Sequence, residues 1–309
     1  MVTAASIGCA AVPSSSPASD VRDLVQLGRD HPGFRDPAYR ARRNVIAQIA
    51  LDHDFGETVP VAPYTEAEQG VWRTIRALLD GVQGDTVCRE FLAMQQVFPL
   101  DRESIPQLQD LNPRLAAATG FTMQPVMGLV TARTFVEHLA RRMFLSTQYI
   151  RHHSRPLYTP EPDIVHELIG HAAALAHPEV ADLNARMGRA ALVASTSEME
   201  RLERVYWYVL EFGVVEQDGD VRAFGAGLLS SAGELEQMRS GPELRGWDLD
   251  GIADTDYDPT CMQPWLFVAP SFDRLLADLT EWVELGRWRD DAPRWGRLTP
   301  PERPSLSRG

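Results

Sequence analysis

The chain has 309 residues, of which 44% are hydrophobic and 24% charged, and its formal net charge is −13 at pH 7. A chain of this size can bury a substantial core in one large domain or two modest ones. The acidic balance favours a small-molecule ligand over nucleic acid, because nucleic-acid binding needs positive charge to neutralise phosphates. We also expect no membrane-spanning helix, since no stretch reaches the roughly 18 to 20 apolar residues that one requires.

Both ends of the chain differ in composition from its middle. Residues 1–20 are dominated by small residues, Ser and Pro, and residues 291–309 are rich in Arg and Pro. We therefore expect flexible tails on either side of one ordered domain at 21–290. The first segment lacks the basic region of a secretory signal, and the three cysteines are odd in number and show no C-x-x-C spacing. Both features predict a cytoplasmic protein.

Four segments have the pattern of helices. The first, 36–53, begins with Asp36 followed by Pro37, and the second, 65–82, begins with Thr65 and Glu68 in the spacing of a capping box. Helical periodicity returns later in the chain, at 131–150 and 197–215.

Strand-like segments are fewer and shorter than the helical ones. We expect them at 121–130, at 214–225, where Asp218 and Gly219 form a hairpin signal, and at 261–269. The chain has no repeat period and no G-x-G-x-x-G after a strand, so neither a solenoid nor a dinucleotide-binding fold is expected. The predicted fold is mainly α (α+β), a single helical domain with a small β-sheet.

Residues 160–177, "PEPDIVHELIGHAAALAH", contain a pair of histidines with unusual spacing. The segment "HELIGH" resembles the H-E-x-x-H zinc motif, but His166 and His171 are five positions apart rather than four. In a regular α-helix, residues four apart project about 40° from each other and residues five apart about 140°. Two rings at this spacing cannot share a metal ion on an undistorted helix. A helix that loosens near Gly170 would bring them together, because glycine tolerates unusual backbone angles.

A metal site here needs a third ligand, and Glu211 is the candidate. It is a lone carboxylate in the apolar and aromatic run "YWYVLEFGVVEQ", where burying it unpaired would be costly. Two neutral histidines and one carboxylate form the facial triad that suits Fe(II) and leaves positions open for oxygen and water. Pairing of Glu211 with an arginine explains the same carboxylate equally well. We do not include the other nearby histidines, His152, His153 and His177, among the ligands. His177 fits no common ligand spacing, and we expect a surface or hydrogen-bonding role.

Six segments in order resemble the pterin-dependent aromatic amino acid hydroxylases, and most of all the short bacterial phenylalanine hydroxylase. They are "HPGFRDPAYRARR", "TGFTMQPVMGL", "STQYIRH", "YTPEPDIVHELIGH", "YWYVLEFG" and "AFGAGLLSSAGELE". The resemblance covers about 21–290, the catalytic domain of that family. It implies iron in a central pocket, a family-specific five-residue histidine spacing, and tetrahydrobiopterin or a related reduced pterin with O₂ as cosubstrates.

The resemblance also implies roles for individual residues. It places Fe(II) on His166, His171 and Glu211. It implies that the substrate is bound by Arg151, Thr159, Asp163, Trp207, Phe212 and Ser230. It implies that the pterin is bound by Gly128, Leu129, Val130, Phe135 and Glu167, and that Glu167 and Trp207 are catalytic.

Within these sets, Arg151 resembles the group that binds the substrate carboxylate, with Asp163 supporting it, because a planar guanidinium suits a carboxylate. Trp207 and Phe212 resemble the aromatic walls around the substrate ring, and Glu167 an acid that reaches the pterin through water. Without the resemblance, Leu129, Val130 and Phe135 would be interpreted as core and Glu167 as a solvated helix residue.

The implied reaction is hydroxylation of a free aromatic L-amino acid, with phenylalanine converted to tyrosine. A phenylalanine 3-hydroxylase giving meta-tyrosine and a tryptophan hydroxylase are alternatives. They stay open because the chain departs from the family pattern at Leu145, at Ala172–Ala174, and at Pro259 and Cys261. A zinc hydrolase and a noncatalytic amino acid binder are rivals from other classes. With no separate oligomerisation segment visible, we expect a monomer whose partner is a small-molecule amino acid.

Overall fold

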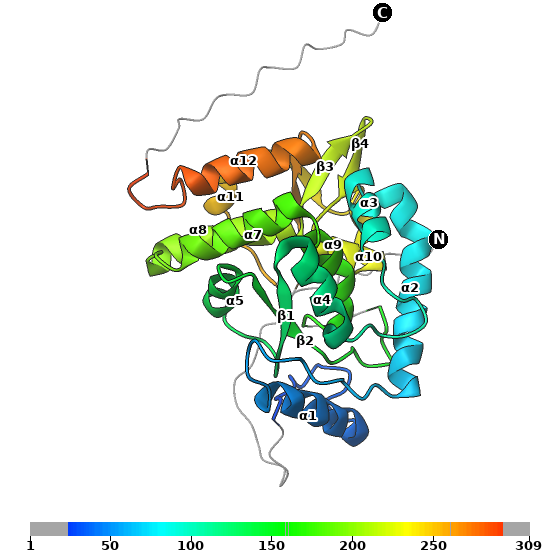
Figure 1. The fold of residues 1–309 in the computed structure, drawn as a ribbon. Helices are drawn as coiled ribbons and strands as arrows, with labels where there is room; N and C mark the ends of the chain where they lie inside the picture. Colours follow the sequence, from blue (N-terminus) through cyan, green and yellow to red (C-terminus); the bar gives the residue numbers. More distant parts are fainter. Residues whose placement is uncertain (1–23, 158, 160, 260, 293–309) are drawn as a thin grey trace, which may run out of the picture.

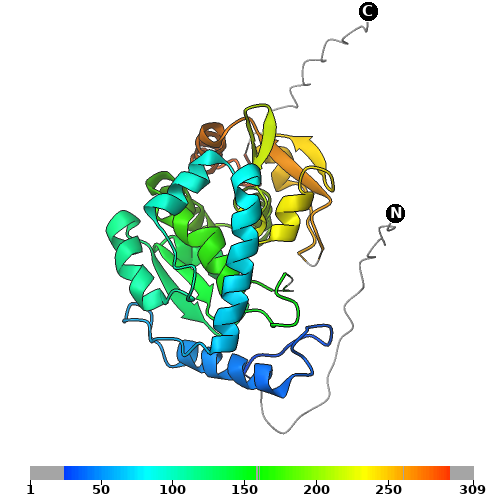
Figure 2. The ribbon, with the colours of Figure 1, turned by 90° about the vertical axis from the view of Figure 1, so that its right-hand side faces the viewer.

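The first two helices begin at the residues whose capping pattern predicts them. In the computed structural model, which describes residues 24–157, 159, 161–259 and 261–292, α1 spans Pro37–Leu51 and α2 spans Glu66–Thr86. The Asp36 side chain accepts hydrogen bonds from the first backbone N–H groups of α1. The reciprocal capping box of Thr65 and Glu68 starts α2. α2 runs along one side of the molecule, with α1 at its lower end (Figures 1 and 2).

Helices continue through the rest of the described chain. The remaining α-helices are α3 (Arg89–Val97), α4 (Leu108–Thr119), α5 (Ala132–Leu139), α6 (Ala173–Leu175), α7 (Pro178–Ala191), α8 (Thr196–Val205), α9 (Ala226–Leu229), α10 (Ala232–Gln237), α11 (Leu249–Ala253) and α12 (Phe272–Glu284). Two segments are π-helices, η1 (His166–Ala172) and η2 (Tyr206–Glu211). The predicted mainly helical single domain is confirmed. None of the helices in the described ranges is both long and apolar enough to cross a membrane.

The strands form two small sheets rather than the one that we predicted. β1 (Thr122–Val126) pairs in parallel with β2 (Met143–Thr147). The second sheet has the order β4-β3-β6-β5, formed by β3 (Val214–Gln217), β4 (Asp220–Ala223), β5 (Glu243–Gly246) and β6 (Trp265–Ala269). The β3–β4 hairpin turns at Asp218 and Gly219, both with positive φ, as the sequence signal predicts.

The prediction of a continuous helix over 131–150 is wrong in its second half. α5 ends at Leu139, Arg142 takes a left-handed φ of 54°, and β2 follows. Four of the five residues of β2 are buried, and they pair with β1. Burial on both faces of a strand removes the alternation that would have identified it in the sequence, so helical periodicity was misleading here.

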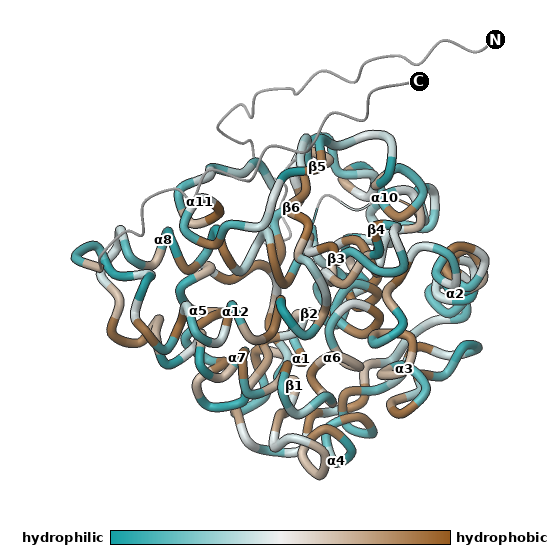
Figure 3. The backbone as a smooth tube through the Cα atoms, turned by 90° about the horizontal axis from the view of Figure 1, so that it is seen from above, coloured by the Kyte–Doolittle hydropathy of each residue, from teal (hydrophilic) through white to brown (hydrophobic). Residues whose placement is uncertain are grey.

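The core surrounds η1. Its fully buried aromatic side chains are Trp72, Phe91, Phe121, Phe144, Tyr208 and Trp282. Leu168, Ile169 and Ala172 of η1 belong to the same buried cluster. Hydrophobic and hydrophilic residues alternate along helices such as α2 (Figure 3), and the buried Val71, Trp72, Ile75 and Leu79 of that helix belong to this core. The two histidines of η1 are thus held by a segment that is packed on all sides.

Candidate active site

The five-residue histidine spacing is accommodated by a π-helix. Residues 166–172 form η1, in which hydrogen bonds run from i to i+5 and the turn is wider than in an α-helix. His166 and His171 therefore lie on the same side, and their Nε2 atoms are 3.1 Å apart. The sequence placed the distortion near Gly170, whereas it extends over the whole of η1.

Gly170 permits the close packing that accompanies this turn. A Cβ atom at this position would lie 2.8 Å from both the Cβ and the carbonyl oxygen of Ala226, the first residue of α9. Such contacts are shorter than atoms tolerate, so η1 and α9 approach each other this closely only because residue 170 has no side chain.

The third candidate ligand comes from the second π-helix. Glu211 is the last residue of η2, and its Oε1 lies 3.2 Å from His171 Nε2 while its Oε2 lies 3.4 Å from His166 Nε2. Among the described residues, the ion-pair partners of Glu211 are these two histidines, and no arginine pairs with it. Three potential ligand atoms from two distorted helices thus converge on one point.

The separations within this group fit a divalent cation. The three distances are 3.1, 3.2 and 3.4 Å. Two ligand atoms at right angles, each about 2.1 Å from an ion, lie about 3.0 Å apart, so the two imidazole nitrogens fit neighbouring positions of an octahedron, and one oxygen of the adjacent Glu211 carboxylate can supply the third. Two imidazoles and one carboxylate are also the donor set of the facial triad, which suits Fe(II).

Ser230 fixes the tautomer of His166. The Ser230 Oγ donates its only proton to the carbonyl oxygen of Ala226 at 2.8 Å, and it lies 3.2 Å from His166 Nδ1. The hydroxyl can then only accept from the imidazole, so Nδ1 carries the ring proton and Nε2 keeps its lone pair for the shared point. Ser230 thus contacts a candidate metal ligand, whereas the resemblance implied a role near the substrate.

The protonation of the three side chains reflects burial and mutual attraction. Burial lowers the pKa of His166 to about 4, so this ring is neutral at pH 7. Burial acts in the same direction on His171, but the Glu211 carboxylate outweighs it and raises the pKa of that ring. Burial would raise the pKa of Glu211, yet His171 and His166 together lower it. The carboxylate stays ionised and contributes negative charge to the centre.

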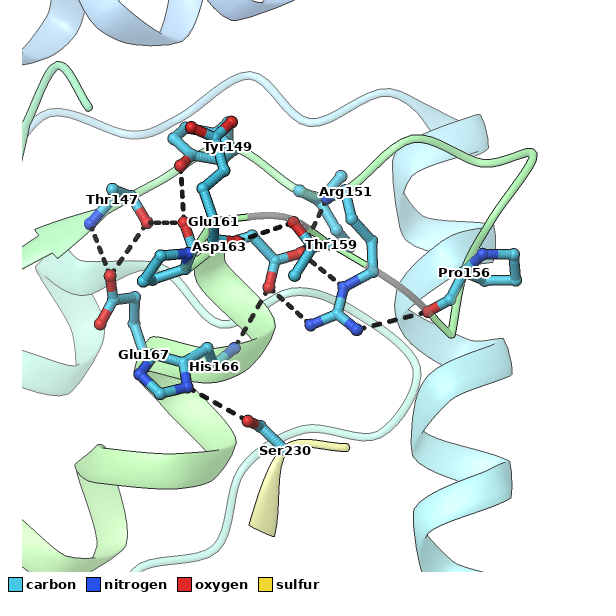
Figure 4. Close-up of polar contacts among 12 residues, drawn as sticks. Thr147, Tyr149, Arg151, Pro156, Thr159, Glu161, Asp163, His166, Glu167 and Ser230 are labelled. Atoms are coloured by element: carbon cyan, nitrogen blue, oxygen red, sulfur yellow. Dashed lines mark hydrogen bonds and ion pairs between the residues drawn. The ribbon is translucent and has the colours of Figure 1, made fainter. Parts of the chain in front are cut away.

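Arg151 and Asp163 form a buried pair next to His166 (Figure 4). Arg151 Nε and Nη2 each donate to Asp163 at 2.8 Å, and the backbone N–H of Arg151 donates to the same carboxylate. The backbone N–H of His166 also donates to Asp163, at 3.3 Å. Although burial would raise the pKa of Asp163, the pairing with Arg151 lowers it. This carboxylate therefore joins the guanidinium to the start of η1.

The Arg151 guanidinium retains hydrogen-bonding capacity. Of its five N–H donors, two are used by Asp163, and one Nη1 donor is 3.4 Å from the carbonyl oxygen of Pro156. Two donors remain for a ligand, enough for one carboxylate. The Thr159 hydroxyl donates to the carbonyl oxygen of Glu161 and has no recorded bond to Arg151 (Figure 4).

Glu167 is a buried acid and not a solvated helix residue. Its Oε1 accepts hydrogen bonds from the backbone N–H of Thr147 at 3.2 Å and from the Thr147 hydroxyl at 3.0 Å (Figure 4). Burial raises its pKa to about 7. Thr147 lies in β2, which the sequence predicted as helix, so this partner was missed.

Aromatic side chains lie along the start and the end of η2. The Trp207 ring stacks on Tyr257 at 4.4 Å and contacts Phe212 at 4.8 Å between ring centroids. Its Nε1 donates to Gln263 Oε1 at 3.0 Å. Tyr257 and Gln263 were not predicted, because they lie in a loop and before a strand, with no pattern linking them to Trp207.

The four candidate pterin-binding residues near β1 separate into two groups. Leu129 is 68% exposed and Val130 is 37% exposed, so the interpretation of these two as core is wrong, and Gly128 beside them is half-buried. Phe135 on α5 instead packs edge-on against Phe144 at 5.1 Å. The Phe144 ring in turn lies 4.6 Å from the ring of His171, which links this segment to the centre.

A second group of potential ligands lies at the start of α1. Asp36, His152 and His153 lie close together there. Both ring nitrogens of His152 are already engaged, one with Asp36 Oδ2 at 3.1 Å and the other with Ser154 Oγ at 2.7 Å. These contacts agree with the exclusion of His152 from the predicted ligands.

Comparison with known proteins identifies the family. Residues 21–287 match the model of the biopterin-dependent aromatic amino acid hydroxylases. The chain is 45% identical to mouse tyrosine 3-monooxygenase, over 80% of this chain and 50% of that protein. It is 43% identical to phenylalanine-4-hydroxylase of Caenorhabditis elegans, over 84% of this chain and 58% of that protein. The chain thus spans only about half the length of these curated relatives.

Solved structures give the same result for the fold. Phenylalanine hydroxylase of Chromobacterium violaceum with bound oxidised Fe(III) superposes with a TM-score of 0.71 at 31% identity, covering 84% of this chain and 97% of that one. The chain belongs to the biopterin-dependent aromatic amino acid hydroxylase family.

Proposed function

We propose that this chain is a pterin-dependent monooxygenase with non-haem Fe(II), that it hydroxylates the ring of a free aromatic L-amino acid, and that its reaction is phenylalanine to tyrosine. The catalytic domain is assigned to 21–290. The observation that carries the proposal is the convergence of His166 Nε2 and His171 Nε2, 3.1 Å apart, with the Glu211 carboxylate, whose Oε2 lies 3.4 Å from the first nitrogen and whose Oε1 lies 3.2 Å from the second. Membership of the family supports the same activity and disfavours both a zinc hydrolase and a noncatalytic binder.

His166, His171 and Glu211 would hold the iron. The ligand atoms are preorganised, because the Ser230 hydroxyl fixes the tautomer of His166 and burial keeps that ring neutral. Because the three donors would lie on one face of the iron, the coordination positions on the opposite face would stay free for small molecules. When bound, Fe(II) and the reduced pterin supply the activation of O₂ that ring hydroxylation requires.

Arg151 would bind the carboxylate of the amino acid through its two remaining donors. Asp163 holds the guanidinium at a fixed orientation and is itself hydrogen-bonded to the backbone of His166. This chain of contacts sets the distance between the substrate carboxylate and the metal ligands. Thr159 and Ser230 would lie near the charged end of the substrate, and the rings of Trp207 and Phe212 would enclose its aromatic ring and exclude water.

The pterin would bind at the segment after β1. The exposed side chains of Leu129 and Val130 offer apolar surface beside the half-buried Gly128, and Phe135 would stack against the bicyclic ring. Glu167 would reach the pterin through water. With a pKa of about 7, this carboxyl can hold or release a proton near neutral pH.

Phenylalanine is the proposed substrate for two reasons. The solved structure reported above is a phenylalanine hydroxylase, and so is another similar structure from the same organism. The curated relatives, however, include both phenylalanine and tyrosine hydroxylases. In addition, the bulky Trp207 ring, which stacks on Tyr257 and contacts Phe212, would narrow the space for a bicyclic substrate ring.

Product analysis tests the proposal. Anaerobically purified enzyme is loaded with Fe(II) and supplied with reduced pterin, O₂ and phenylalanine, tyrosine or tryptophan, and products are identified by mass spectrometry and NMR. We expect para-tyrosine from phenylalanine, with pterin oxidation. His166→Ala, His171→Ala and Glu211→Ala should each lose iron, measured by elemental analysis, and turnover.

The outcomes separate the alternatives. Meta-tyrosine, or a higher kcat/KM with tyrosine or tryptophan, would change the assigned reaction within the family. Normal iron content in Glu211→Ala would exclude the proposed ligand set. Hydrolysis with bound zinc and no oxygen uptake would reject a monooxygenase.

A further inference from the structure

A cavity of about 430 Å³ lies between α2 and α3, on a side of η1 that the proposed reaction does not use. Its lining residues come from α2, α3, the loop that follows α3, η1 and α6, and they include Arg76, Asp80, Gln83, Leu92, Phe98 and Ile169. None of the proposed iron, substrate or pterin residues is among them. Figure 1 shows α3 beside α2 at this side of the molecule.

Arg76 is the unusual feature of this cavity. It is only 9% exposed, yet its guanidinium makes no hydrogen bond to any described residue, and its Nε is fully buried without a partner. Among the described residues its ion-pair partner is Asp80, whose Oδ1 is 4.0 Å away, and the Trp72 ring is centred 5.9 Å from the guanidinium carbon. A buried cation without hydrogen bonds is costly, so a ligand that supplies acceptors would be bound favourably.

The nearby charges leave this cation only partly compensated. Asp80 is the one carboxylate that lines the cavity, and Arg102 Nη1 already donates to its Oδ2 at 2.6 Å. Two guanidinium groups therefore face one carboxylate, an excess of one positive charge. Burial lowers the pKa of Arg76, in keeping with a cation that lacks a full counter-charge.

The remaining walls combine apolar surface with amides. Leu92, Phe98 and Ile169 provide apolar contacts. Gln83 is internally satisfied, because its Nε2 donates to the carbonyl oxygen of Leu229 and its Oε1 accepts from Gln95. The cavity therefore offers a cationic group at Arg76 and an apolar region, with no second anionic side chain.

We propose that this cavity binds a small organic monoanion, a carboxylate on an apolar body, with its carboxylate at Arg76 and its apolar part against Leu92, Phe98 and Ile169. A carboxylate accepts two parallel hydrogen bonds from a guanidinium, and the two Nη groups of Arg76, which make no hydrogen bond to a described residue, would donate them. A multiply charged phosphate fits less well, since only one positive charge is in excess. The inference does not depend on the proposed hydroxylase activity.

Benzoate binding to the full chain tests this inference, because benzoate combines one carboxylate with one ring. We expect saturable binding by isothermal titration calorimetry. In Arg76→Met, whose side chain is apolar and unbranched, the affinity should fall at least about tenfold, the loss of one charge-assisted contact. Arg76→Lys should keep part of the affinity. Benzamide, which has the same ring without the charge, should bind at least about tenfold more weakly than benzoate.

Two controls make the test decisive. Arg151→Lys weakens the proposed substrate site, so benzoate binding that is lost in this variant and retained in Arg76→Met would place benzoate there and overturn the inference. Leu92→Trp keeps Arg76 but fills the cavity, and it should also lose affinity. Circular dichroism verifies that each variant is folded. Equal benzoate affinity in wild type, Arg76→Met and Leu92→Trp, or no binding by wild type, would reject the proposal.

Discussion

The Nε2 atoms of His166 and His171 lie 3.1 Å apart, although the residues are five positions apart in the sequence. A regular α-helix would direct the two rings about 140° apart. The π-helix η1 removes this mismatch, and η2 brings Glu211 to the same point. The geometry of the centre thus depends on two segments of unusual backbone, which packing against neighbouring elements must maintain.

Gly170→Ala should destabilise the protein and weaken its iron binding. The new Cβ would lie 2.8 Å from the backbone oxygen of Ala226, so η1 and α9 would have to separate. We expect a loss of about 1 to 3 kcal/mol in the free energy of unfolding, as for other overpacked cores. Chemical denaturation and iron titration measure the two effects.

Gly81→Ala is the matched control for this substitution. Gly81 is an exposed helical residue of α2, and a Cβ there would meet no atom within 4 Å. Alanine should stabilise this helix by roughly 0.5 to 1 kcal/mol. If both variants had the same free energy of unfolding, close packing against Ala226 would not be the reason why position 170 is a glycine.

Ser230→Ala should reduce metal affinity by about tenfold or more while leaving the fold intact. The variant loses the hydroxyl that accepts from His166 Nδ1, so the ring can adopt the tautomer that protonates Nε2. Ser231→Ala removes the neighbouring hydroxyl, which caps α10 and does not contact His166. It should cost about 0.5 to 2 kcal/mol of stability and leave iron affinity unchanged. Equal iron dissociation constants in the two variants would contradict the tautomer argument.

The sequence predicted the members of the site better than the backbone that holds them. The histidine spacing and the isolated carboxylate of Glu211 indicated three residues that the structure places within 3.4 Å of each other. Hydrogen bonding from i to i+5 was not predictable, because it is maintained by tertiary contacts such as that of Gly170 with Ala226.

The failures in the fold have a similar cause. The capping residues Asp36 and Thr65 act locally, and the helices that they begin were predicted correctly. β2 is set by its pairing with β1 and by burial on both faces, and neither is visible in a local pattern. Because β2 was missed, the hydrogen bond from Thr147 to Glu167 was not predicted either. Tyr257 and Gln263 were missed for another reason, since no sequence pattern links them to Trp207.

Arg151→Lys should weaken amino acid binding by about tenfold or more without loss of iron. A lysine ammonium cannot contact both oxygens of Asp163 and also present two parallel donors to a carboxylate. The KM for the amino acid should rise more than kcat falls, and iron content should be normal. Arg155→Lys, an exposed position in the same loop, serves as the control and should leave KM unchanged. An unaltered KM in Arg151→Lys would mean that Arg151 does not bind the substrate and has only a structural role, as the ion-pair partner of Asp163.

Trp207→Phe should shift the preference from phenylalanine towards tryptophan. The smaller ring removes volume next to Phe212, and it also loses the hydrogen bond to Gln263. Differences of this kind are worth about 1 to 3 kcal/mol, so a change of roughly tenfold in the ratio of kcat/KM values is expected. Competition assays with both amino acids measure the ratio. A constant ratio would show that Trp207 does not set the substrate preference, and Ala172–Ala174 and Pro259 would be the next residues to test.

Glu234→Gln should stabilise the protein, and more so at high pH. Glu234 lies on α10, its side chain forms no hydrogen bond or ion pair with the residues that the structure describes, and burial raises its pKa to about 7. A raised carboxyl pKa means that the folded state retains a proton that the unfolded state releases at lower pH. The stability of the wild type should therefore fall as pH increases from about 4.5 to 7, and the full penalty should persist above that range.

Glutamine removes this titration while keeping the shape of the side chain. The difference in unfolding free energy between Glu234→Gln and wild type should be near zero at about pH 4.5. At about pH 8 it should reach about 1 to 2 kcal/mol, which is less than the full pKa shift would give because solvent partly screens the side chain. Denaturant titrations at several pH values measure it. Glu236→Gln, an exposed position on the same helix, is the control and should show no such trend. A stability difference that is the same at both pH values would show that Glu234 ionises in the folded protein as readily as in the unfolded chain, and the argument from burial would then fail at this position.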